Sequence, residues 1–442
     1  MGAALGPDFP GDIALAVSGG GDSMAMLTLA HNWAHRWGVR LWVVTVDHGL
    51  RPEAADEARM VASECALLGH PHATLRWHRE GAGNLMEAAR NARLSLIDRW
   101  RGGLGHVLMA HTRDDVAETF LMRLARGSGV DGLSAMAATR RIEGASDKSP
   151  LPERDRDGAL PPGGADTDAE GFTLVRPCLD MGREELRHYL RTLKGRWVDD
   201  PSNDDPGFDR ARIRHSLRHL AEVGLTAETL SATAHRMTRA REALRLRARE
   251  AWQRMGTEGA GAGGARTGDL LFARELFEDL DRDTAMRLLA AALQYVASAI
   301  HRPRAEALEN LLDRLLGGGG GTLHGCEARM ERDALRIFRE LKSVDQHRAV
   351  VGAPGLWDRR WRIFHPDFNG MEVRALGEDG WRQVPDRPAV APPHHAARSL
   401  PAIWDGAALV ACDALDVGPG QTATLCPMSG RGDGFDRFLL SH

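Results

Sequence analysis

The chain has 442 residues, enough for roughly three domains at about 150 residues each. Hydrophobic residues make up 43% of the sequence and charged residues 27%, a balance that excludes wholesale disorder. The formal net charge is −4, so any nucleic-acid partner must be met by a local basic patch. No stretch approaches the run of about 20 apolar residues that a membrane helix needs, and the first residues lack a secretory signal pattern.

The cysteines and lysines exclude several kinds of site. The five cysteines are scattered and form no CxxC pair, which excludes a disulfide framework, an iron–sulfur site and a zinc knuckle of the usual spacings. None of the few lysines lies in a glycine-rich turn, which excludes a GxxxxGK[ST] phosphate loop. These features predict a cytoplasmic protein of several domains with no membrane partner.

The first 140 residues alternate short apolar strands with helices. Strands are predicted at residues 13–17, 41–46, 74–78 and 107–110, and helices at 23–37, 53–68, 84–100 and 114–126. This alternation predicts an α/β fold, in which a parallel sheet has helices on both faces. Ligands bind such sheets at the carboxyl ends of the strands, where polar clusters follow Val17, Val46 and Ala110.

Beyond this region the composition changes several times. Residues 143–171 are rich in Pro, Gly, Asp and Glu, which predicts an exposed, poorly ordered insertion. Helical patterns run through 183–217, 227–255 and 270–316, with a flexible glycine-rich break at 256–264. Short strands, prolines and tryptophans follow. We therefore predict an α/β domain at 1–220, a helical domain at 221–345 and a small β-containing domain at 346–442.

The strongest local signal is a glycine-rich loop between the first strand and the first helix. It consists of Ser18, Gly19, Gly20, Gly21, Asp22 and Ser23. Glycines let the backbone approach a polyanion, and the N–H groups that start the following helix hold phosphate oxygens. Asp22 suits such a cradle when Mg²⁺ bridges it to phosphate. The alternative is a tight turn in which Ser23 is the helix N-cap.

Charged side chains also gather where later strands end. Asp115 and Glu118 are spaced i, i+3, so they project from one face of a helix that begins at a strand's carboxyl end. Two carboxylates there without a nearby lysine suit a cationic substrate. The alternative is a pair of helix N-terminal acids favoured by the helix dipole. Asp47, His48 and His111 also follow strands, and the pattern leaves open whether the histidines bind a ligand or only pack.

Two groups of arginines each have an ordinary structural interpretation. Glu87 and Arg90 are spaced i, i+3, which on the sequence alone favours a surface ion pair. From residue 207 to 254 there are eleven arginines against five acidic residues, the local positive excess expected for an RNA backbone site. The alternative for this stretch is a solvated helix face.

Several motifs, taken together, resemble one family. SGGGDS at 18–23 resembles the SGGxDS loop of the ATP-pyrophosphatase superfamily, which adenylates carbonyl oxygens and releases pyrophosphate. The segments at 46–51, 111–129, 200–203 and 208–214, and the helix positions Asn84, Glu87, Arg90 and Arg93, resemble motifs of the tRNA(Ile)-lysidine synthetases. The resemblance covers residues 12–220 well. It departs at Thr112 and Ala211, where that family usually has histidine and asparagine.

The resemblance implies a reaction and its participants. The wobble cytidine of tRNA(Ile) with a CAU anticodon would be adenylated at C2 by ATP, and the ε-amine of free lysine would displace AMP to leave lysidine. ATP and Mg²⁺ are the implied cofactors, and tRNA(Ile) and L-lysine are the implied partners, with no obligate protein partner.

The resemblance also implies site residues. The ATP site would use the loop residues 18–23 with Asp47, His48 and His111, and Asp22 would hold Mg²⁺. Lysine would be bound by Asp115 and Glu118, while Asp22, Arg90, Asp115 and Glu118 would serve catalysis. The tRNA would be bound by Asn203, Arg210, Arg212 and Arg214.

Three other functions compete with this one. A tRNA thiolase usually needs cysteine pairs or an iron–sulfur cluster, and the chain has no CxxC. A catalytically inert tRNA-binding module is disfavoured by the intact glycine-rich loop together with Asp115 and Glu118. A small-molecule amidotransferase would need a glutaminase block, and none is visible.

Overall fold

The computed structural model describes residues 1–50, 52–79, 85–142, 144, 149, 151–163, 171–199, 207, 209–426 and 434–441. Contacts between residues divide the chain into two units, 1–241 and 242–442. The division falls inside the long helix α9 (Ala227–Met255), whose predicted span of 227–255 is confirmed.

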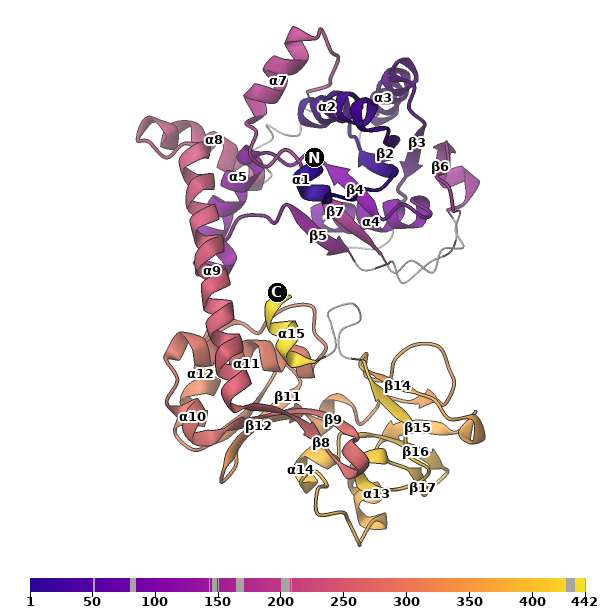
Figure 1. Cartoon of the computed structure of the whole chain (residues 1–442), viewed down its shortest axis with the longest axis vertical. Helices are drawn as coiled ribbons and strands as arrows, with labels where there is room; N and C mark the ends of the chain where they lie inside the picture. Colours follow the sequence, from indigo (N-terminus) through magenta and orange to yellow (C-terminus); the bar gives the residue numbers. More distant parts are fainter. Residues whose placement is uncertain are drawn as a thin grey trace. The chain divides into compact units, whose positions relative to one another are not determined.

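Residues 1–241 contain a seven-stranded sheet in the order β5-β7-β4-β1-β2-β3-β6 (Figure 1). The five central strands run parallel: β7 (Phe172–Val175), β4 (His106–Met109), β1 (Asp12–Ala16), β2 (Arg40–Asp47) and β3 (His72–Arg76). The edge strands β5 (Thr139–Ile142) and β6 (Arg156–Gly158) are antiparallel to their neighbours. The four predicted strands are confirmed, with β3 two residues earlier than expected.

Helices cover both faces of this sheet because successive strand residues point to opposite sides. Ile13 and Leu15 of β1 pack with α2 (Gly21–Trp37), α3 (Ala54–Leu68) and α7 (Arg183–Thr192). Ala14, between them, faces α4 (Leu85–Trp100), which contributes Leu96, Ile97 and Trp100 to the second core. The predicted α/β fold with helices on both faces is confirmed.

A third, smaller core lies beside the sheet. Helix α5 (Arg113–Leu124) contributes Val116, Ala117 and Phe120, which pack with Leu230 and Ala234 of α9. The short α6 (Val130–Leu133) and α8 (Asp209–Glu222) also contact α5. This packing sets α5, with its acidic residues, against the arginine-rich α8. The remaining helix of this unit, α1 (Gly2–Leu5), is a single turn at the start of the chain.

Two expectations for this unit are wrong. Residues 151–163 of the supposed disordered insertion include β6, which pairs with β3; main-chain hydrogen bonds at an open sheet edge need no apolar side chains. The helical pattern at 183–217 is also interrupted, because α7 ends at Thr192 and Val198 forms a bridge with Gly20. Most of residues 200–208 lie outside the described ranges.

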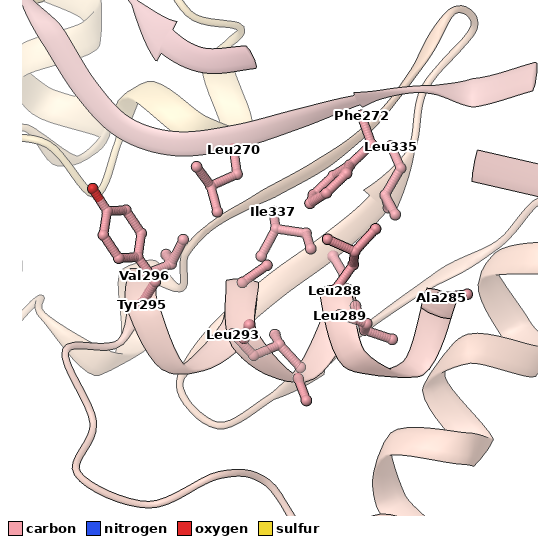
Figure 2. Packing of buried hydrophobic residues seen from close by; sticks show 14 of the residues in the cluster. Leu270, Phe272, Ala285, Leu288, Leu289, Leu293, Tyr295, Val296, Leu335 and Ile337 are labelled. Atoms are coloured by element: carbon pink, nitrogen blue, oxygen red, sulfur yellow. The ribbon is translucent and has the colours of Figure 1, made fainter. Parts of the chain in front are cut away.

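The second unit combines a sheet with helices. Its antiparallel sheet has the order β10-β11-β12-β9-β8. The strands are β8 (Gly256–Ala260), β9 (Arg266–Ala273), β10 (Gly320–Leu323), β11 (Cys326–Met330) and β12 (Ala334–Arg339). The helices α10 (Arg274–Glu278), α11 (Arg282–Val296) and α12 (Ala305–Leu316) belong to the same core, as does α15 (Phe435–Leu440). Figure 2 shows Leu288 of α11 pointing toward Phe272, Leu335 and Ile337 of the sheet, and Leu293 belongs to the same core.

The predicted flexible break at 256–264 is wrong for its first half. Residues 256–260 form β8, which pairs with β9, and glycine-rich backbone can pair in this way without large side chains. The helical expectation for 270–316 holds only after Ala273, where β9 ends.

The last part of the second unit is small and rich in β-structure, as expected. A four-stranded sheet has the order β13-β15-β16-β17, formed by Ala349–Val350, Glu372–Ala375, Pro401–Asp405 and Ala408–Ala411. The strands β14 (Trp361–Ile363) and β18 (Ala423–Leu425) form a separate pair, and two short helices, α13 (Gly377–Gln383) and α14 (His394–Ala397), complete the region. Trp357, Trp361 and Trp404 lie in its core, and Trp381 is partly buried against it. In the described ranges no helix has the length and apolar content that crossing a membrane requires.

Candidate active site

The glycine-rich loop connects β1 to α2 at the carboxyl end of the central strand. Ser23 Oγ accepts a hydrogen bond from Ser18 N (3.1 Å) and donates one to the carbonyl oxygen of Gly20 (2.9 Å). Gly19 has φ +89°, a left-handed backbone conformation that favours glycine. The helix N-cap is Gly20, so the alternative that made Ser23 the N-cap is wrong; Ser23 lies inside the helix and its hydroxyl shapes the loop.

A later segment covers the loop from outside. Val198 N donates to the carbonyl oxygen of Gly19 at 2.9 Å, and Trp197 packs against the core beside it. The loop leads into the start of α2, where the first N–H groups have no acceptor within the helix and the positive end of a 17-residue helix favours an anion.

Three carboxylates surround the guanidinium of Arg183, the first residue of α7, and a fourth accepts from its backbone N–H. Its Nε lies 3.2 Å from Asp22 Oδ2, its Nη1 lies 3.1 Å from Glu118 Oε1, and its Nη2 lies 3.5 Å from Asp115 Oδ1. The backbone N of Arg183 donates to Asp114 Oδ2 at 2.7 Å. We call Asp22, Asp114, Asp115 and Glu118 the carboxylate cluster. It joins the glycine-rich loop to α5 in one site.

Glu118 has a second arginine partner. Its side chain is 1% exposed, and Arg214 of α8 donates from Nε to Oε1 at 2.6 Å. Burial of a carboxylate is costly without such partners. The two arginines therefore neutralise much of the charge that the carboxylates bring to the site.

Asp115 also stabilises the start of α5. Its Oδ2 accepts hydrogen bonds from Thr112 N (2.8 Å) and Thr112 Oγ1 (2.9 Å), a capping box that starts α5. These bonds, with the Arg183 charge, hold the pKa of Asp115 below its usual value although burial acts in the opposite direction. Thr112, a departure from the family pattern, thus serves as the N-cap.

Asp22 differs from the rest of the carboxylate cluster in having one buried oxygen that no described residue binds. Its Oδ1 is buried without a hydrogen-bond partner, and burial raises the pKa of the carboxyl despite the neighbouring Arg183. Mg²⁺ is commonly held by one or two carboxylates together with substrate phosphates. A free carboxylate oxygen at the phosphate loop fits that arrangement, although the described ranges contain no group of three or more side chains able to hold a metal alone.

Five arginines from four parts of the fold form a second group of like charges. We call them the arginine cluster: Arg90 and Arg93 of α4, Arg140 of β5, Arg176 directly after β7, and Arg210 of α8. Burial and the charges of the other arginines lower the pKa of Arg93 and of Arg176 to about 10. His111 lies beside this cluster, and burial lowers its pKa to about 4, so it is neutral at pH 7.

Comparison with known proteins decides the family. The model of the PP-loop domain matches residues 3–221. A tRNA(Ile)-lysidine synthase of Ruegeria pomeroyi is 38% identical to this chain, over 98% of this chain and 95% of the relative. The chain belongs to the tRNA(Ile)-lysidine synthase family. Relatives with the same name from a Bradyrhizobium species and from Rhodopseudomonas palustris are 40% and 44% identical, over 74% and 53% of this chain and 89% and 61% of their own lengths.

Membership in the tRNA(Ile)-lysidine synthase family confirms the resemblance drawn from the motifs, and the PP-loop domain supports the use of ATP. The structure brings Asp22, Asp115 and Glu118 together, as the predicted site requires. Asp47 lies at the end of β2, where its Oδ1 accepts from Gly49 N at 2.8 Å and closes the turn that contains His48. The Nδ1 atoms of His48 and His111 are buried without a partner.

The predicted tRNA-binding arginines lie in different environments. Arg210 belongs to the arginine cluster, whereas Arg214 pairs with Glu118 and Arg212 pairs with the exposed Asp209. Arg249, from the basic stretch on α9, pairs with Asp436 at 2.7 Å. Asn203, and the motif residue Asn84, lie outside the described residues.

Motif analysis did not single out Arg183, which contacts three carboxylates, or Arg140 and Arg176 of the arginine cluster. Arg183 lies 161 positions after Asp22, so no local spacing connects them. Arg176 follows an apolar strand directly, at the carboxyl end where site residues are expected, and that position could have identified it.

Proposed function

We propose that this chain makes lysidine in tRNA(Ile): it adenylates C2 of the wobble cytidine with ATP and then joins lysine to that carbon. The single observation that carries the proposal is the contact between Arg183 and three carboxylates, which joins the phosphate loop to the acidic face of α5. Two half-reactions with a common intermediate need such a shared site, because the adenylated base must meet the amine where it was formed.

In the first step the cytidine O2 attacks the α-phosphorus of ATP, and pyrophosphate leaves with the electrons of the broken P–O bond. The glycine-rich loop and the start of α2 would bind the phosphates through backbone N–H groups. We propose that Asp22 Oδ1 holds Mg²⁺, which when bound supplies positive charge to the leaving pyrophosphate.

In the second step the ε-amine of lysine forms a bond to C2, and the C2–O bond breaks with its electron pair going to AMP. The ammonium group gives up one proton before attack, and the nitrogen loses another as AMP departs. Asp115 and Glu118 are proposed to bind the ammonium and to help remove a proton, with Arg90 near the adenylated base. The partial neutralisation by Arg183 and Arg214 would favour release of that proton.

The proposal also covers the role of residues 221–442 and the cellular location of the protein. Residues 221–345 and 346–442 are proposed to position the tRNA, and the basic stretch of α8 and α9 supports this role through its charge. ATP, lysine and tRNA are all available in the cytoplasm, which is the proposed location.

The test is incubation with ATP, Mg²⁺, radiolabelled lysine and a tRNA(Ile) transcript with a CAU anticodon, followed by counting of acid-precipitable label. We expect label that depends on ATP and disappears when the wobble cytidine is replaced by uridine. Pyrophosphate release without label would point to a different nucleophile. Absence of both would favour a tRNA-binding module without catalysis.

A further inference from the structure

The arginine cluster has no counter-charge of its own in the part of the chain that the structure describes. No ion pair to a carboxylate is formed there by Arg90, Arg93, Arg140, Arg176 or Arg210, whereas most other arginines near the site have one. The hydrogen bond from Arg176 Nη1 to the carbonyl oxygen of Ala137 (2.7 Å) leaves its positive charge unneutralised. The cluster therefore concentrates like charges that repel one another.

The fold holds these side chains close together. Arg140 pairs in register with Leu174 on the adjacent strand, and Arg176 N donates to the carbonyl oxygen of Ala138 at 2.8 Å, so β5 and the end of β7 are fixed to each other. Arg90 and Arg93 are one turn apart on α4, the helix that covers this face of the sheet. The charges of Arg90 and Arg93 act on Arg176, and that of Arg210 acts on Arg93, so these positive charges lie within electrostatic reach of one another.

The arginine cluster contains buried polar atoms that have no hydrogen-bond partner among the described residues. Arg176 is 5% exposed, and its Nε has no hydrogen-bond partner. The Nε of Arg93 and the Nδ1 of His111 are also buried and unpaired. An unsatisfied buried donor costs about 1–3 kcal/mol, so an anion that accepts hydrogen bonds from the two arginine Nε atoms would be stabilised.

We propose that the arginine cluster is a second phosphate-binding site, separate from the glycine-rich loop, formed by Arg93, Arg140 and Arg176 together with Arg90 and Arg210. Guanidinium groups match phosphate oxygens with two parallel hydrogen bonds, and several of them suit a dense anion better than a single charge. The phosphates come either from the RNA backbone beside the target base or from the pyrophosphate end of ATP. The RNA assignment rests on the proposed function, whereas phosphate binding itself does not.

Arg140→Gln is the principal test, with Arg141→Gln as its matched control. The two residues are neighbours in β5, and successive strand residues point to opposite faces, so only Arg140 belongs to the cluster. Arg140 is exposed, so its replacement leaves the fold intact, and removing one of several like charges should leave the melting temperature unchanged or raise it. A lower melting temperature for Arg140→Gln than for Arg141→Gln would indicate a structural role and overturn the proposal.

Two binding measurements distinguish the sources of phosphate. If RNA is the ligand, Arg140→Gln weakens tRNA binding by about tenfold and lowers the salt slope of log Kd by about 1, while the KM for ATP stays at the wild-type value. If ATP is the ligand, the KM for ATP and the inhibition constant of added pyrophosphate rise by about tenfold, and tRNA binding stays unchanged.

Arg176→Gln is the second variant and should shift the same constants in the same direction, by a larger factor because Arg176 is buried. If Arg176→Gln does not fold, the exposed Arg140→Gln decides the question alone. Effects no larger than those of Arg141→Gln on both ligands would overturn the proposal. A wild-type protein that binds tRNA(Ile) without making lysidine would contradict the proposed function, and the phosphate-site test would still stand.

Discussion

The carboxylate cluster and the arginine cluster lie at the same carboxyl edge of one sheet, yet they balance their charges differently. Arg183 and Arg214 form ion pairs with Asp22, Asp115 and Glu118, so the carboxylate cluster contains its own cations. Among the described residues, no carboxylate forms an ion pair with the arginine cluster.

This difference shows that, within the described ranges, the protein neutralises the charges of the carboxylate cluster with its own side chains but not those of the arginine cluster. Internal partners keep the acidic side stable without ligand, and a small cation such as an ammonium group must share those carboxylates with arginines. The basic side stays unneutralised until an anion arrives. The free protein is therefore better prepared for phosphate than for lysine, and the predictions below change one side at a time.

The largest effect is expected for Asp22→Ala, which removes the only carboxylate of the cluster with a free buried oxygen. We expect adenylation to fall by about 100-fold or more, because charge on the leaving pyrophosphate loses its stabilisation. Binding of tRNA should stay close to wild type. The measurement is tRNA-dependent pyrophosphate release, and unchanged release would refute the role of Asp22 in holding Mg²⁺.

The next effect is expected for Arg183→Gln, which leaves three carboxylates without their shared cation. Removing one partner of a buried ion pair typically costs about 3–5 kcal/mol, and the Arg183 side chain is 18% exposed, so we expect the free energy of unfolding to fall by about 2–3 kcal/mol. Urea unfolding measures the loss. Arg191→Gln is the control, because Arg191 lies two turns along α7, is largely exposed and pairs only with Glu184 among the described residues.

Arg183→Lys sharpens this result, since lysine restores the charge without the planar fork that reaches three carboxylates. We expect a partial recovery of stability. If Arg183→Gln and Arg191→Gln unfolded at the same urea concentration, the carboxylate cluster would not depend on Arg183.

A smaller effect is expected for Glu118→Gln on lysine use. The buried carboxylate would lose its charge but keep its shape, so the KM for lysine should rise by about tenfold and adenylated tRNA should accumulate. Quench-flow measurement of the two half-reactions separates them. A wild-type KM for lysine combined with failed adenylation would place Glu118 in the first step.

The sequence predicted those parts of the site that depend on local pattern. The strands before Val17 and Ala110 and the glycine-rich loop have short signatures, and the structure confirms their placement. Thr112 followed three positions later by Asp115 also matches a capping box, although the pattern gave the threonine no role.

The rest of the site depends on partners far away in the sequence. Arg183 meets Asp22 across 161 positions, and nothing around either residue indicates the other. In a chain where nearly every basic residue is arginine, composition does not show which arginines find carboxylates and which gather together. Strand β6 was missed for a different reason, because its pairing uses only main-chain groups.

The smallest effect concerns His111, which lies between the two clusters and reports on both. The Asp115 charge raises the pKa of His111, whereas burial and the charges of Arg176 and Arg93 lower it, with a net value of about 4. Between pH 6.5 and 4 the unfolded chain binds a proton that the folded chain does not, so stability falls as the pH decreases through this window. His111→Gln should remove about 1–2 kcal/mol of the stability difference between pH 7 and pH 5.

Titration of the His111 imidazole by NMR then compares the two clusters directly. Arg176→Gln should raise the pKa of His111, because it removes a repelling charge, and Asp115→Asn should lower it further, because it removes an attracting one. Bound phosphate should act like Arg176→Gln and raise the pKa if it occupies the arginine cluster. Shifts in the same direction for both variants would show that His111 responds to altered packing and not to the opposite charges on its two sides.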